Sequence, residues 1–305
     1  MPSLDLPTWL LSLLLAPFGL VLGSFCNVLI HRLPQEEPAE RNVVTKPSHC
    51  PSCKTPIKPW HNIPLLGWLW LRGKCAACGW RIPLRYPLVE LLCGLIWAGS
   101  VWIFPFGTLI WAKGLICLTA LLVLFFTDFT EFILPDVLQF PLMALGVAFT
   151  LPQMFLSERL ITVANRGSFE FLRVDLWTNA LQPAPAWTTM GLTVDLKTSL
   201  IGLMAGYGIP ATINQVFKWI RKTDGLGMGD FKMLAWLGAF WGWQAMLGIF
   251  FGAILLMLVA ILPMLIMRKG GAQTMVPLGC TLALATPVMV FYGPALWMGY
   301  LGMMQ

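Results

Sequence analysis

Long apolar runs separated by short polar segments dominate this chain of 305 residues. Several runs reach the roughly 20 residues that an α-helix needs to cross a bilayer. A membrane β-barrel would instead show short segments of alternating polarity. The pattern predicts an all-α polytopic membrane protein with about eight transmembrane helices. Their approximate spans are 9–31, 86–104, 107–127, 133–156, 198–217, 230–242, 245–267 and 277–300.

One apolar run is too long to be a single membrane helix. Residues 233–267 carry no charge, and as one helix they would measure about 52 Å against a hydrocarbon core of about 30 Å. We therefore expect the chain to turn near Trp241-Gly242-Trp243, which makes the helix before the turn short.

Composition and charge placement set the topology. The chain is 57% hydrophobic and 11% charged, which excludes a soluble globular protein. The net charge of +6 does not indicate nucleic-acid binding, because the Lys and Arg residues lie between apolar runs. In such positions they indicate which loops of a membrane protein face the cytoplasm. With eight helices most of them fall on one side, in 32–85, 218–232 and 268–269, and the positive-inside rule makes that side the cytoplasm.

The same topology predicts the organisation of the chain. The first apolar run lacks a basic segment before it and a cleavage site after it, so it is read as a membrane helix and not as a signal peptide. The expected parts are a first transmembrane helix in 1–31, a cytoplasmic domain in 32–85, helices in 86–156, a polar outer (periplasmic) insert in 157–197, and helices in 198–305. Pro183 and Pro185 argue against one continuous helix in the insert.

Four of the eight cysteines form two CxxC pairs in the cytoplasmic segment, namely Cys50, Cys53, Cys75 and Cys78. Such pairs predict a tetrahedral Cys₄ zinc site, and a reducing cytoplasm favours metal over disulfide. Four sulfurs close the site, so its expected role is to fold a small domain between helices one and two. A redox dithiol pair is the alternative, which metal analysis and thiol titration would separate. The single cysteines in apolar runs are expected to pack.

Two aspartates at the ends of apolar runs are the candidate catalytic groups. Asp128 ends one run and Asp230 opens another; eight helices place both near the cytoplasmic face, whereas seven would separate them. A charge in such a place is costly and tends to serve function. Neighbouring carboxyls share a proton and can divide acid and base roles in peptide hydrolysis. Alternatively these aspartates, and Asp136 with them, cap helices or pair with lysines.

Four stretches together resemble the bacterial type IV prepilin peptidases, also called prepilin leader peptidases/N-methyltransferases. They are Gly23–Pro34, the two CxxC pairs continued by Arg85–Glu90, Asp128–Asp136, and Gly227-Met228-Gly229-Asp230-Phe231-Lys232. The last reads Gly-Met-Gly-Asp where the family commonly has Gly-Gly-Gly-Asp, which keeps the GxGD pattern. The insert at 157–197 is longer than usual for the family.

The resemblance implies an aspartic protease of the bacterial cytoplasmic (inner) membrane, with Asp128 and Asp230 as the catalytic pair. It implies cleavage of the basic leader of prepilins or type II secretion pseudopilins after a glycine, at the cytoplasmic face. It also implies pilus or secretion machinery as partners, and methylation of the new N-terminus with S-adenosylmethionine. No GxGxxG motif marks a Rossmann-type site. Asn27 and Glu90 are the candidates for a methyl-donor pocket. The alternatives are that Asn27 only makes a hydrogen bond at the end of a helix and that Glu90 is a buried polar packing residue.

Three other functions remain open from the sequence. A membrane dithiol oxidoreductase would need reactive, metal-free thiols. A non-enzymatic scaffold, whose zinc domain docks a pilus or secretion motor, predicts that both aspartates tolerate substitution. A GxGD protease acting on other transmembrane substrates would not require a basic leader that ends in glycine.

Overall fold

The computed structural model describes residues 6–37, 40–43, 47–104, 106–152, 172–174, 181–183, 194–223, 225, 227–266 and 277–303. The chain forms two compact units, one of Asp5–Pro135 and one that holds Asp136–Gln305. Among the described residues, five helices are long and apolar enough to cross a membrane, and two shorter apolar helices accompany them. The predicted class, a helical multi-pass membrane protein with a cysteine cluster between its first two long helices, is confirmed.

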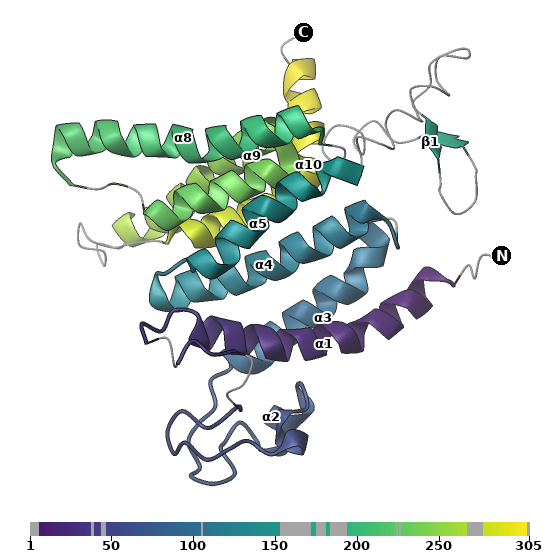
Figure 1. Ribbon diagram of the computed structural model, residues 1–305, viewed down its shortest axis with the longest axis vertical. Helices are drawn as coiled ribbons and strands as arrows, with labels where there is room; N and C mark the ends of the chain where they lie inside the picture. Colours follow the sequence, from purple (N-terminus) through teal and green to yellow (C-terminus); the bar gives the residue numbers. More distant parts are fainter. Residues whose placement is uncertain are drawn as a thin grey trace. The chain divides into compact units, whose positions relative to one another are not determined.

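The first unit contains three long helices and a small segment between the first two. The helices are α1 (Thr8–Arg32), α3 (Arg85–Ile103) and α4 (Leu109–Glu131), and the segment holds η1 (Pro59–Asn62) and α2 (Leu66–Trp70) (Figure 1). Helix α1 packs along α3, and α4 contacts both. A Cβ added at Gly23 would lie 2.6 Å from Cα of Glu90. Glycine at this position therefore lets the two backbones approach, as small residues do in membrane helix pairs.

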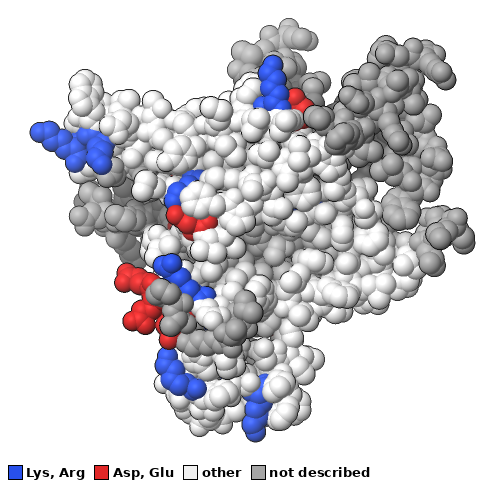
Figure 2. All heavy atoms as spheres, viewed as in Figure 1, with Lys and Arg blue, Asp and Glu red and all other residues white. Residues whose placement is uncertain are grey.

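The outer face of α1 is apolar and exposed. Leu14, Phe18, Val21 and Phe25 recur at helical spacing and are all exposed, Phe18 by 65%. Wide stretches of the described surface carry no charged side chain in the view of Figure 2. Both observations are typical of helices that lipid surrounds.

The second unit is arranged around one central helix. It contains α5 (Asp136–Ala148), α8 (Leu196–Arg221), α9 (Met228–Ile266) and α10 (Leu278–Met303). Helices α5, α8 and α10 all pack against α9, and the side chains from Met233 to Trp241 are buried, apart from Gly238, which has none. A helix that is apolar on every side must be covered either by protein, as this part of α9 is, or by lipid.

Gly242 interrupts α9. Its backbone has φ 83° and ψ 166°, which is not helical, within a segment of 39 residues. The positive φ is accessible to glycine and strained for other residues. The interruption that the length of the apolar run predicted at Trp241-Gly242-Trp243 is therefore confirmed.

The predicted outer insert lies largely outside the described residues. Its described parts include two short strands, β1 (Leu172–Val174) and β2 (Leu181–Pro183), paired antiparallel with Arg173 opposite Gln182. These strands were not expected from the sequence and add a two-stranded ribbon to the otherwise helical fold. The helix predicted over 133–156 starts at Asp136. Pro135 disfavours a helical conformation at Leu134, so the helix does not include the residues before Asp136.

Candidate functional site

The two CxxC pairs form two turns with the same hydrogen bonds. In the first, the N–H of Lys54 donates to the carbonyl of Cys50 (2.9 Å) and the N–H of Cys50 donates to the carbonyl of Thr55 (3.0 Å). In the second, the N–H of Gly79 donates to Cys75 (2.9 Å) and the N–H of Cys75 donates to Trp80 (2.8 Å). The repeated pattern points both cysteines of each pair toward a common centre.

The four cysteine sulfurs have the spacing of a metal site. All lie within 4.8 Å of one another, and the Sγ atoms of Cys50 and Cys78 are 3.9 Å apart. Tetrahedral zinc with Zn–S bonds of about 2.3 Å would place its sulfurs about 3.8 Å apart. The predicted ligands Cys50, Cys53, Cys75 and Cys78 could therefore hold one metal ion without large movement.

Hydrogen bonds favour the thiolate form that binds metal in two of the four ligands. The hydroxyl of Thr55 lies 3.2 Å from Sγ of Cys53, and together with the backbone of Thr55 it lowers the pKa of Cys53 to about 6. The backbone of Cys78 and Ala77 lowers the pKa of the Cys75 thiol in the same way. At Cys78 the lowering effect of a backbone hydrogen bond from Trp80 is outweighed by burial and by the other three cysteines, which raise the pKa to about 11. At neutral pH at least one ligand is thus deprotonated before metal arrives.

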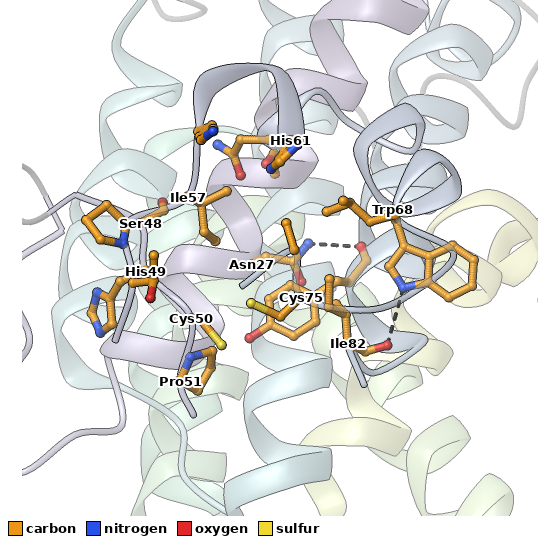
Figure 3. Close-up of a pocket in the computed structure, with 18 of the residues that line it drawn as sticks. Asn27, Ser48, His49, Cys50, Pro51, Ile57, His61, Trp68, Cys75 and Ile82 are labelled. Carbon is orange, nitrogen blue, oxygen red and sulfur yellow. Dashed lines mark hydrogen bonds between the residues drawn. The ribbon is translucent and has the colours of Figure 1, made fainter. Parts of the chain in front are cut away.

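A cavity of about 350 Å³ lies between α1, the first turns of α3 and the cysteine segment. The two residues that the sequence offered for a cofactor pocket, Asn27 and Glu90, both line it, together with Trp68 and Tyr86. Figure 3 shows Asn27 and Trp68 among the lining side chains. Nδ2 of Asn27 donates to the carbonyl of Tyr86 at 3.0 Å. Asn27 is only 4% exposed, and within the described part of the chain its Oδ1 accepts no hydrogen bond.

Glu90 connects α3 to the cysteine segment. Its Oε2 accepts a hydrogen bond of 2.8 Å from the N–H of Leu65. Leu65 has φ 59° and ψ −49°, and the N–H of Leu66 donates to the carbonyl of Pro64 at 2.6 Å. These values describe the rare, strained form of the γ-turn, so the carboxylate fixes a backbone that would otherwise relax. Such strain tends to occur at functional sites.

Asp128 occupies the last turn of α4. It is 6% exposed, although it is a carboxylate. The helix ends where Phe132 adopts a left-handed conformation and its N–H donates to the carbonyl of Asp128. The neighbouring Thr127 bonds back to the carbonyls of Val123 and Leu124, which satisfies its buried hydroxyl within the helix.

Asp230 occupies the first turn of α9. Its N–H donates to the carbonyl of Gly227 at 3.1 Å. A Cβ added at Gly227 would lie 3.2 Å from Oδ2 of Asp230, so glycine keeps that side of the carboxylate clear of side-chain atoms. Asp128 belongs to the first unit and Asp230 to the second.

Lys232, two residues after Asp230 in the chain, forms an ion pair that sequence reasoning did not assign. Nζ of Lys232 donates to both carboxylate oxygens of Asp136, at 2.6 and 2.7 Å, and lies over the ring of Phe140. Pairing with a lysine was one of the alternatives for Asp136, but the sequence did not show which lysine. The only sequence feature that could have indicated Lys232 is that both residues lie at the starts of apolar helices.

Comparisons with known proteins cover nearly the whole chain. Residues 18–104 match the model of the bacterial peptidase A24 N-terminal domain, and residues 176–262 match that of the type IV leader peptidase family. A prepilin leader peptidase/N-methyltransferase of Stutzerimonas stutzeri is 34% identical over 93% of this chain and 91% of its own length. Proteins of the same name from Pseudomonas aeruginosa (32%, over 93% and 91%) and Dickeya chrysanthemi (35%, over 78% and 76%) are also similar. No solved structure matches.

Proposed function

Because this chain belongs to the family of type IV prepilin leader peptidases and N-methyltransferases, we propose that Asp128 and Asp230 together cleave the leader of its prepilin substrates. The cut falls after a glycine that ends a basic leader, at the cytoplasmic face of the inner membrane. The observation that carries this proposal is the similarity to a named relative over 93% of the chain, across both compact units.

Cleavage needs two carboxyls in different protonation states. The ionised one takes a proton from water, and the water oxygen adds to the scissile carbonyl carbon. The protonated one polarises that carbonyl and supplies the proton that the leaving amine needs when the C–N bond breaks. The clear side of the Asp230 carboxylate, beside Gly227, supports the approach of an extended backbone there.

The cysteine cluster is proposed to hold zinc. Its four sulfurs suit a closed tetrahedral site with no position for substrate, so its contribution is to hold the segment around η1 and α2 in place. That segment carries Leu65 and Trp68, which reach α3 and the cavity. The basic residues around it support a cytoplasmic location.

Methylation of the new N-terminus is the second proposed activity, since the similar proteins are named for both. S-adenosylmethionine, when bound, supplies an electrophilic methyl group. The lone pair of the N-terminal amine forms the new N–C bond, the electrons of the broken C–S bond stay on sulfur, and the amine loses a proton to water. The residues of the chain have to bind the donor and orient the amine.

The test uses purified, zinc-loaded protein and a prepilin peptide with a basic leader that ends in glycine, incubated with and without S-adenosylmethionine. Mass spectrometry should find cleavage after the glycine in both cases, and a gain of one methyl group on the mature peptide only with the donor. Cleavage without methylation would leave only the peptidase. No cleavage by folded protein would contradict the proposal, and cleavage of peptides without the leader would indicate a broader intramembrane protease.

A further inference from the structure

We propose that the cavity between α1, α3 and the cysteine segment is the methyl-donor site, with Asn27 and Glu90 as its polar contacts. This inference rests on the proposed methyl transfer. The size is suitable, because small-molecule sites begin at about 300 Å³ and this cavity measures about 350 Å³. Every residue that lines it lies within the first unit, so it forms without the second.

The amide of Asn27 gives the first argument. Its Nδ2 donates to the carbonyl of Tyr86, and this bond fixes the orientation of the amide, since the flipped form would set two oxygens against each other. Oδ1 is therefore an acceptor, buried and without a donor among the residues that the structure describes. A buried acceptor without a partner costs about 1–3 kcal/mol. Oδ1 is closed to solvent, so a ligand N–H or O–H group would have to displace part of the lining to reach it, and would then remove this cost.

Glu90 gives the second argument. The carboxylate faces the cavity while the N–H of Leu65 holds one of its oxygens, and the Ser24 side chain also interacts with it. Anchored from two elements, it keeps its position without a ligand and needs little reordering to bind one. Asn27 and Glu90 thus offer acceptors, one of them an anion, whereas Arg32 and Lys58 bring cations to the same lining. Groups of both kinds match a donor that carries a sulfonium, an ammonium, a carboxylate and ribose hydroxyls.

Aromatic side chains give the third argument. Trp68 and Tyr86 line the cavity, and Nε1 of Trp68 donates to the carbonyl of Ile82 at 3.3 Å, which holds the indole in place (Figure 3). A fixed aromatic surface beside acceptors suits a purine, whose flat face stacks and whose amino group donates. The combination favours a nucleoside-bearing cation over a purely apolar ligand.

The test measures binding apart from activity. Calorimetry on the zinc-loaded full-length protein compares sinefungin, which carries a cationic amine near the methyl position, with neutral-sulfur S-adenosylhomocysteine. Wild type should bind both. Glu90→Gln and Asn27→Leu should weaken sinefungin about 10- to 100-fold, and Glu90→Gln should weaken it more than S-adenosylhomocysteine. The matched control is Glu131→Gln, an exposed carboxylate of the same unit outside the cavity, which should bind as wild type.

Zinc content and leader cleavage are measured on every variant and should stay unchanged. Undiminished ligand binding in both Glu90→Gln and Asn27→Leu would overturn the inference. Failure of wild type to bind either ligand would also overturn it, together with the methyl-transfer half of the proposed function, while intact cleavage would leave the peptidase standing. Displacement of sinefungin by a basic leader peptide would instead assign the cavity to substrate.

A second measurement does not depend on any variant. Hydrogen exchange of the wild-type protein with and without sinefungin should show protection in 62–68 and 86–90, which border the cavity. Protection confined to other segments would overturn the inference.

Discussion

The four cysteines lie within one unit of the chain, on two turns with matching hydrogen bonds. Asp128 and Asp230 belong to different units, at the end of one helix and the start of another. The cysteine cluster is thus determined by local backbone geometry, whereas the proposed aspartate pair takes one residue from each unit. Metal binding and peptide cleavage should therefore respond differently to the same perturbations.

The strongest test of this difference is removal of one carboxyl. Asp128→Asn and Asp230→Asn should each lower leader cleavage by about 100- to 10,000-fold, because one proton-transfer group is lost. Zinc content and methylation of a pre-cleaved peptide should remain at wild-type levels. The check is cleavage and methylation measured on separate peptides by mass spectrometry. Equal loss of both activities would show that the two sites are not independent.

Metal removal should affect the first unit in particular. Structural zinc contributes roughly 10–16 kcal/mol to folding in small zinc domains, so chelation should unfold residues 47–83. Hydrogen exchange should report rapid exchange there, with the helices of the second unit still protected. If the second unit lost protection to the same extent, the separation of the two units would be wrong.

The pH dependence of zinc binding sharpens the same point. The four ligands bind as thiolates, so protons compete with zinc and affinity falls as pH falls. The pKa of Cys53 is lowered to about 6, so this thiol is already largely ionised at pH 7.5 and fewer than four protons should be released there. Calorimetry in buffers of different ionisation enthalpy measures how many protons are released when zinc binds. Release of all four protons at pH 7.5 would contradict the Thr55 contact.

A smaller effect is expected from the ion pair in the second unit. Lys232 and Asp136 connect the starts of α9 and α5, and Lys232 follows Asp230 by two residues. A half-exposed pair contributes up to about 1 kcal/mol, so Lys232→Met or Asp136→Asn should lower cleavage about 3- to 10-fold. The exchanged pair Asp136→Lys with Lys232→Asp should restore part of it, and Glu131→Gln should have no effect. Absence of rescue would assign the loss to other contacts of Lys232.

The last test distinguishes the two cysteine turns, and its second substitution should have the smallest effect of all. Lys54 and Gly79 occupy equivalent places with φ of 58° and 71°, and a Cβ at Gly79 would meet nothing within 4 Å. Gly79→Ala should therefore weaken zinc retention by about 1–2 kcal/mol through backbone strain alone. Lys54→Gly relieves that strain but raises the conformational entropy of the unfolded chain. The two effects oppose each other, so zinc retention should change by less than about 1 kcal/mol. Zinc transfer to a competing chelator would measure both.

Much of the helical layout follows from the sequence, because membrane thickness limits helix length. That limit predicted the interruption of α9 at Gly242, and metal chemistry predicted that four cysteines would converge. The cavity could not be predicted in this way. Resemblance pointed to Asn27 and Glu90, but their spacing does not show that they share a cavity.

Two further features depend on contacts between distant segments. The strained turn at Leu65 exists because Glu90 accepts its N–H, and no local pattern near Leu65 indicates this. The Lys232–Asp136 pair likewise requires α5 and α9 to lie side by side with their starts together. Hydropathy gives the lengths of such helices but not which of their ends meet.

The two aspartates occupy opposite ends of their helices. Asp128 lies in the last turn of α4, where backbone carbonyls project, and Asp230 lies in the first turn of α9, where amide N–H groups project. Aligned peptide dipoles disfavour an anion at the first place and favour it at the second. The two proposed catalytic carboxyls therefore lie in opposite fields of their own helices, Asp128 beside backbone carbonyls and Asp230 beside amide N–H groups.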